Sequence, residues 1–181
     1  MKRTNFYIGI LGRWKDESIE VLSLCEQIGE RIASYGAVLV CGGSPGAVEA
    51  ACKGAKTAGG ITLGILPSNN KEEANRYVDL VIPTGLGYEV RSALVIRASD
   101  ALILVGGGNG SLGELSMAYL NKKPVVVLSG SGGWADRIQK VMINGHYLDE
   151  RNNVPIISTY SPFECVQMAI ELAQKSRTGR S

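Results

Sequence analysis

Short runs that are apolar from end to end, separated by segments with helical periodicity, constrain this chain more than any other feature. A strand is apolar throughout when both of its faces are covered, and alternation with helices is typical of βαβ units. The runs span residues 6–11, 37–41, 61–66, 80–83, 101–105, 125–128 and 154–158. The sequence therefore predicts an α/β fold, a Rossmann-like open parallel sheet of about seven strands with helices on both faces.

The intervening segments predict six helices at residues 17–35, 47–58, 89–98, 112–120, 135–143 and 162–174. Gly36 and Gly59 each lie just past a helix, where glycine commonly ends one, and Ser161 with Glu164 forms a capping-box pattern. The polar stretch at 67–77 predicts a mobile loop or a short helix. No repeat or linker interrupts the pattern, so we expect one ligand-binding domain over residues 1–175 and a frayed tail over 176–181.

Charge and composition limit the classes of partner that this protein is expected to bind. The formal net charge is +2 and the basic residues are scattered, which argues against a nucleic-acid partner. No apolar stretch reaches the roughly 18 to 20 residues of a membrane span, so a soluble, cytoplasmic protein with no membrane partner is expected. The four cysteines form no C-x-x-C pair and are interpreted as reduced thiols. His146, the only histidine, has no metal-ligand partner at a usable spacing, and no metal site is predicted.

Three glycine-rich loops follow predicted strands: CGGSPG at 41–46, PTGLG at 83–87 and GGGNGS at 106–111. In open parallel sheets, ligands bind outside the carboxyl ends of the strands, and successive backbone N–H groups at a helix start form an anion site. A single such loop is usually only a tight turn, but three at one edge favour a phosphate site. The candidate phosphate-binding residues are Gly42, Gly43, Ser44, Gly85, Gly107, Gly108, Asn109, Gly110 and Ser111.

The sequences of these loops limit the class of phosphate ligand that the site can bind. Residues 108–113 match G-x-G-x-x-G, but the next strand lacks the carboxylate that a dinucleotide site places at its end. The chain contains no G-K-[ST], which excludes a Walker-type triphosphate site. A mononucleotide or a similar monophosphate fits better than NAD or ATP.

Glu114 and Arg91 are the candidate catalytic residues. Ser111 and Glu114 also match the S-x-x-E capping box, so helix capping and catalysis both remain open for Glu114. Arg91 is predicted in the first turn of a helix, where a cation opposes the helix dipole, and this favours a functional role. Glu49 and Glu89 are interpreted as favourable dipole partners, and Arg13 as a solvated side chain.

Residues 40–67 (VCGGSPGAVEAACKGAKTAGGITLGILP), 81–115 (VIPTGLGYEVRSALVIRASDALILVGGGNGSLGEL) and 122–128 (KKPVVVL) together resemble the LOG-like (SLOG) superfamily. The P-G-G-x-G-T-x-x-E motif of its enzymes aligns with residues 106–114, where glycine replaces the proline and Ser111 the threonine. The arginine of the family's R-K pair aligns with Arg91, with Asp100 nine positions later, while Ser92 replaces the lysine.

This resemblance implies two functions. One is hydrolysis of the N-glycosidic bond of a nucleoside 5'-monophosphate, which releases base and ribose 5-phosphate without a cofactor. In it Glu114 would stabilise charge on the sugar, Arg91 would contact the nucleotide and the 107–111 turn would hold the phosphate. The other is a carrier of molybdenum cofactor or a nucleotide sensor, in which no reaction occurs. The family also implies a homo-oligomer, a dimer or tetramer, to which the apolar run at 115–120 would contribute unless it packs in the core.

Overall fold

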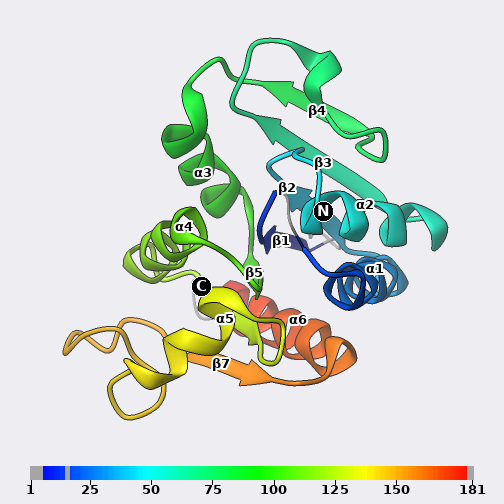
Figure 1. The fold of residues 1–181 in the computed structure, drawn as a ribbon. Helices are drawn as coiled ribbons and strands as arrows, with labels where there is room; N and C mark the ends of the chain where they lie inside the picture. The colour runs from blue at the N-terminus through cyan, green and yellow to red at the C-terminus, as the bar shows by residue number, and fades with distance from the viewer. Residues whose placement is uncertain (1–5, 15–16, 179–181) are drawn as a thin grey trace.

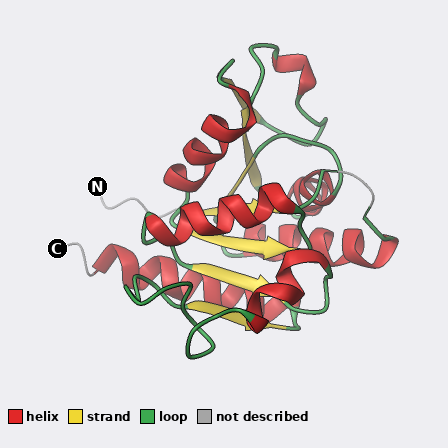
Figure 2. Cartoon of the chain, turned by 60° about the vertical axis from the view of Figure 1, so that its left-hand side comes forward, coloured by secondary structure: helices red, strands yellow, loops and turns green. Residues whose placement is uncertain are grey.

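The structure is a computed structural model that describes residues 6–14 and 17–178. Seven parallel strands form one sheet in the order β4-β3-β2-β1-β5-β6-β7, and in Figure 2 the arrows in the lower part of the sheet point the same way. This confirms the predicted Rossmann-like α/β class. The strands are β1 (Tyr7–Leu11), β2 (Val38–Cys41), β3 (Ile61–Leu66), β4 (Leu80–Pro83), β5 (Ala101–Val105), β6 (Val125–Leu128) and β7 (Ile156–Thr159).

Helices cover both faces of the sheet. Figure 1 shows α1 and α2 on one side and α3 and α4 on the other. The core follows this division, because alternate residues of β5 pack with α1, α2 and α6 or with α3, α4 and α5. The helices are α1 (Ile19–Ser34), α2 (Ala47–Thr57), α3 (Gly87–Ala98), α4 (Asn109–Leu120), α5 (Gly133–Arg137) and α6 (Pro162–Thr178), with 3-10 helices η1 (Lys71–Glu73) and η2 (Ile138–Lys140).

The sheet changes direction of growth between β1 and β5. From β1 the chain adds β2, β3 and β4 on one side, and it then returns to place β5 on the other side of β1. The two strands pair from Ile8 with Ala101 to Leu11 with Leu104. The loops that leave such a pair diverge, so a crevice opens at their carboxyl ends.

Several element ends differ from the sequence prediction, and three of them differ by three residues or more. α4 begins at Asn109 rather than at 112, so residues 109–111 of the glycine motif lie in the first turn of the helix. The helix predicted over 135–143 stops being α-helical after Arg137, because beyond Ile138 its apolar residues Val141 and Ile143 remain exposed. α6 continues to Thr178, past the predicted start of a frayed tail at residue 176.

The extension of α6 has a clear cause. Nη2 of Arg177 lies 2.5 Å from Oδ2 of Asp100, and its guanidinium lies 4.2 Å from the Phe6 ring centroid. The same Asp100 oxygen accepts a hydrogen bond from the Tyr7 N–H at 2.9 Å. Asp100 therefore secures the amino end of the sheet, away from the carboxyl ends of the strands.

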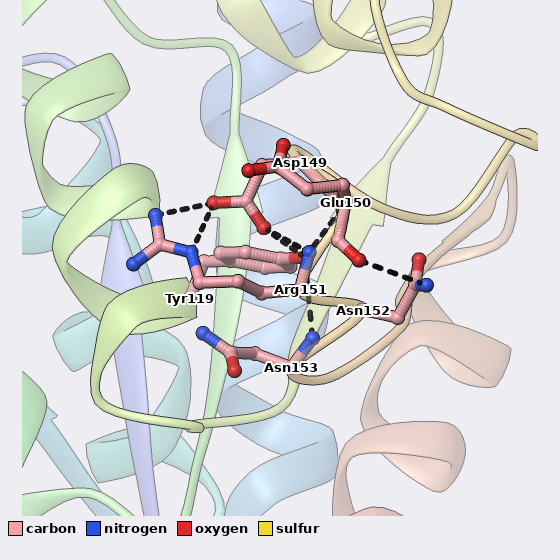
Figure 3. A network of polar contacts seen from close by, with 6 residues as sticks. All are labelled: Tyr119, Asp149, Glu150, Arg151, Asn152 and Asn153. Atoms are coloured by element: carbon pink, nitrogen blue, oxygen red, sulfur yellow. Dashed lines mark hydrogen bonds and ion pairs between the residues drawn. The ribbon is translucent and has the colours of Figure 1, made fainter.

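The long connection between η2 and β7 is fixed by one buried tyrosine. Tyr119, 1% exposed, donates from its hydroxyl to Oδ1 of Asp149 at 3.1 Å and accepts from the N–H of Asn153 at 3.2 Å. Figure 3 shows these contacts together with the ion pair between Arg151 and Asp149. Within the predicted apolar run 115–120, Tyr119, Leu115 and Ala118 thus belong to the core.

Candidate functional site

The first turn of α4 offers backbone donors at the mouth of the crevice. Its N-cap residue, Gly108, is extended, and no side chain caps the helix. The first N–H that bonds back to the helix start is that of Leu112, which donates to the Gly108 carbonyl at 3.1 Å. A Cβ at Gly108 or Gly110 would meet nothing within 4 Å. Within residues 6–14 and 17–178 no hydrogen bond engages the N–H groups of Asn109, Gly110 and Ser111, and such unused N–H groups at a helix start bind anions.

Glycine is required where the chain enters this turn. Gly107 has φ +93°, and a Cβ there would lie 2.7 Å from Cβ of Ser111. The carbonyls of Gly106 and Gly107 accept the N–H groups of Ala135 and Trp134 at 2.9 and 3.0 Å. The start of α5 thus holds the turn in place without using the free N–H groups of α4.

Glu114 does not cap α4. Ser111 lies inside the first turn of the helix, and the carboxylate instead accepts a hydrogen bond from the Ser92 hydroxyl of α3, with Oγ 2.8 Å from Oε1. Burial raises the pKa of Glu114, while the Ser92 hydrogen bond and the positive charge of Arg91 oppose that rise. The capping interpretation is therefore excluded, and Glu114 is a partly buried carboxyl group between two helices.

Arg91 is buried at the carboxyl end of β2. Only 8% of it is exposed, and a Cβ on Gly42 would lie 1.7 Å from its Nη1, so only glycine leaves room for the guanidinium. Its Nε is buried without a hydrogen-bond partner among residues 6–14 and 17–178. A buried cation with an unused donor suits a bound anion. Because α3 begins at Gly87, Arg91 lies in the second turn rather than the first.

The other two glycine loops are tied to the protein itself. The N–H of Gly43 lies 3.4 Å from Sγ of Cys41, and the carbonyls of Gly43 and Ser44 accept from Nδ2 of Asn75. The N–H of Gly85 donates to the Ser68 carbonyl at 3.0 Å. The structure thus brings Gly42, Arg91 and Glu114 together, whereas Gly85 serves a turn beside β3.

A pocket of about 380 Å³ adjoins the same crevice and contains a carboxylate that the sequence did not indicate. Its side chain is 8% exposed and it belongs to Glu17, which lies just before the N-cap of α1, Ser18. The pocket is lined by Arg13, Glu17, Ser18, Val21, Gly106, Gly107, Gly130, Ser131, Gly132 and Gly133. The one available signal was its position in the first strand-to-helix loop, where a switch point between β1 and another strand would place a ligand.

Other classes of site lack support in the part of the chain that the structure describes. No three His, Cys, Asp or Glu residues there are grouped so that they could hold a metal ion. Among the same residues, no helix has the length and apolar character needed to cross a membrane. The four cysteines are buried and free.

The sheet order and the crevice at β1 and β5 define a Rossmann-like protein with a candidate ligand site at the carboxyl ends of its strands. Comparison with protein families gives a match to the SLOG cluster4 family over residues 5–165, and the chain belongs to this family. The resemblance to the LOG-like superfamily is thereby confirmed.

Three relatives carry informative names. The molybdenum cofactor binding protein from Rippkaea orientalis is 31% identical, with TM-score 0.80 over 95% of this chain and 99% of that one. The molybdenum cofactor carrier protein from Chlamydomonas reinhardtii is also 31% identical, with TM-score 0.77 over 94% and 99%. The cytokinin riboside 5'-monophosphate phosphoribohydrolase of Mycobacterium tuberculosis is 34% identical over 62% of this chain and 65% of the enzyme, so this match spans less than two thirds of that relative.

Proposed function

We propose that this protein binds a phosphorylated heterocyclic molecule, with the phosphate at the first turn of α4. The observation that carries the proposal is the start of α4, which has no side-chain cap and opens onto free space at Gly108 and Gly110. Backbone N–H groups and the helix dipole favour an anion there. Asn109, Gly110 and Ser111 supply the donors.

Arg91 adds a fixed positive charge to this site. Its guanidinium is held against Gly42, and its buried Nε is the donor that a phosphate or ribose oxygen would satisfy. Glycine at position 42 leaves room for this guanidinium, and glycine at position 107 leaves room for Ser111 in the turn.

The ligand class that we favour is a phosphorylated pterin such as molybdenum cofactor, carried without reaction. Two molybdenum cofactor proteins align with nearly the whole chain. In addition, Oε1 of Glu114 already accepts the Ser92 hydroxyl, so this oxygen is engaged within the protein rather than directed at a sugar.

A second candidate function is hydrolysis of a nucleoside 5'-monophosphate. The mycobacterial relative and the closeness of Glu114 to Arg91 favour it. In this reaction the bond from C1' to the base nitrogen breaks, water supplies hydroxide to C1' and a proton to the base, and ribose 5-phosphate is released. Glu114 would stabilise the positive charge that develops on the sugar.

A panel of nucleoside 5'-monophosphates separates the two functions. The protein is incubated with each nucleotide, free base is followed by chromatography, and binding is measured in parallel by thermal shift. The carrier proposal predicts binding without release of base. Release of base by the wild type, lost in Glu114→Gln, would instead establish the hydrolase.

We further propose that the protein functions as a homo-oligomer through α3. The N-cap and first turn of this helix expose three apolar side chains, those of Leu86, Tyr88 and Val90, by 53%, 65% and 51%. Apolar side chains gathered in this way mark association surfaces. The surface neighbours Arg91, so association would shield the ligand site from water.

A further inference from the structure

The pocket that contains Glu17 approaches the glycine turn from the other face of the sheet. Glu17 leads into α1, whereas Arg91 and Glu114 belong to α3 and α4, and Figure 1 shows α1 across the sheet from these two helices. Gly106 and Gly107 line the pocket, so it adjoins the turn that leads into the phosphate site. A ligand held by its phosphate at α4 therefore has a second cavity within reach.

Three backbone donors in the wall of this pocket are already used. The N–H groups of Gly130 and Gly132 donate to the carboxylate of Asp136, at 2.6 and 2.9 Å. The N–H of Gly106 donates to Oγ of Ser131 at 2.8 Å, and that hydroxyl donates in turn to the Leu128 carbonyl. These three N–H groups are therefore not available to a phosphate.

The unmet group of the pocket is an acceptor. Oε1 of Glu17 is fully buried and has no hydrogen-bond partner within residues 6–14 and 17–178. It also lies close to Gly106, where an added Cβ would be 3.1 Å away. An unpaired buried carboxylate oxygen is costly, so a group with N–H donors would satisfy it.

The charge of Glu17 is partly balanced by Arg13. Nε of Arg13 lies 3.8 Å from Oε1, which is close enough for charge attraction but too far for a hydrogen bond. With this cation beside the carboxylate, a positively charged ligand group would be repelled. The occupant that fits is a neutral group with N–H donors.

We propose that Glu17 binds the edge of a 2-amino-4-oxopyrimidine ring, the ring shared by guanine and pterins, and so determines which heterocycle this protein accepts. This edge presents the amino N–H and the adjacent ring N–H side by side, and a carboxylate accepts both at once. In adenine the amino group lies beside a ring nitrogen that is an acceptor. This nitrogen would face the carboxylate, which is also an acceptor, and no hydrogen bond would form between them. The inference rests on the proposed binding of a phosphorylated heterocycle and names its class.

Titration calorimetry with four phosphates tests this on the wild-type protein: GMP, IMP, AMP and ribose 5-phosphate. IMP lacks only the 2-amino group, and ribose 5-phosphate lacks the base. We expect GMP to bind at least about tenfold more tightly than AMP, with IMP between them, since the loss of a hydrogen bond to a buried charge has an effect of that size. Comparing the affinities of neopterin monophosphate and GMP shows whether the preferred ring comes from a pterin or from guanine. If either compound binds more tightly than AMP, the result supports the assignment.

Glu17→Gln should bring GMP binding to within about threefold of AMP binding while ribose 5-phosphate binding is unchanged. The matched control is Glu20→Gln, which removes an exposed carboxylate from the first turn of α1, the helix that Glu17 precedes. This variant should keep the preference for GMP. Equal binding of GMP and AMP by the wild type, with ribose 5-phosphate still bound, would overturn the role of Glu17 alone. Failure of all these phosphates to bind would overturn the proposed function as well.

Discussion

Among single residues, Glu114 shows how tertiary packing overrides a local pattern. The S-x-x-E spacing left a helix cap open as one role of Glu114, but the partner of Glu114 is Ser92, 22 positions earlier in the chain. The glycine turn and Arg91 could be selected as candidates from the sequence, because helix starts after parallel strands meet at one edge. Glu17 could not, because its burial depends on Ser131 and its neighbours, which join it only in the folded chain.

The buried carboxylate predicts a pH-dependent difference in stability between the wild type and Glu114→Gln. Because the folded pKa of Glu114 is above its ordinary value of 4.5, the folded protein holds an unfavourable charge at neutral pH. The variant keeps an acceptor for Ser92 and should be more stable at pH 7, by a margin that shrinks as pH falls through the folded pKa toward 4.5. Urea denaturation from pH 4.5 to 8 measures this margin.

Glu89→Gln is the control, since Glu89 is an exposed carboxylate of the first turn of α3. Its neutralisation should not stabilise the protein. A Glu114→Gln variant that is less stable than the wild type at pH 7 would contradict the account of this residue.

At the level of elements, strands and helices followed from the apolar pattern, but the start of α4 did not. Glycine is a poor helix former, so the sequence pattern predicted that this helix begins after the glycine motif. In the structure α4 begins inside the motif at Asn109, because the N–H groups of Trp134 and Ala135 fix the carbonyls of the preceding turn. That support comes from α5, which no local signal in the motif reveals.

The contact between α1 and α2 predicts a second effect. A Cβ at Gly54 would lie 2.0 Å from the Glu26 carbonyl oxygen, so alanine there must push the two helices apart. We expect Gly54→Ala to destabilise the protein by about 1–3 kcal/mol or more. Thermal or urea denaturation measures the loss.

Gly113→Ala is the matched helical glycine on α4, where a Cβ would meet nothing within 4 Å. Here alanine should raise the free energy of unfolding by about 0.5–1 kcal/mol through its greater helix propensity. Equal effects of the two substitutions would contradict the proposed helix contact.

For the whole molecule, the pattern of alternation predicted the class of sheet, whereas the order of its strands comes from the structure. Apolar runs show that a strand is covered, but not which strand lies beside it. The switch point between β1 and β5 is therefore a structural finding, and it is what places Glu17 near the glycine turn. The same limit applies to association: the run at 115–120 packs largely in the core, and α3 bears the exposed apolar side chains.

The exposed side of α3 predicts a homo-oligomer in solution. Sedimentation velocity of the wild type should show a species of at least twice the chain mass, and Val90→Asp should shift it toward the monomer with little change in the fold. Ile19→Asp, at an 81% exposed apolar residue on α1, is the control and should leave the mass unchanged. A monomeric wild type at micromolar concentration would contradict association through α3.

The most direct test of the central claim, that a phosphate binds the first turn of α4, removes one backbone N–H from that turn. Asn109→Pro does this at the first helical position, where proline is favoured, and the preceding Gly108 already has the extended backbone that proline requires. Asn109→Ala keeps the N–H. Titration calorimetry should show ribose 5-phosphate bound about tenfold or more weakly by the proline variant than by the alanine variant. Equal affinity of the two variants, or no binding by the wild type, would contradict the proposed site.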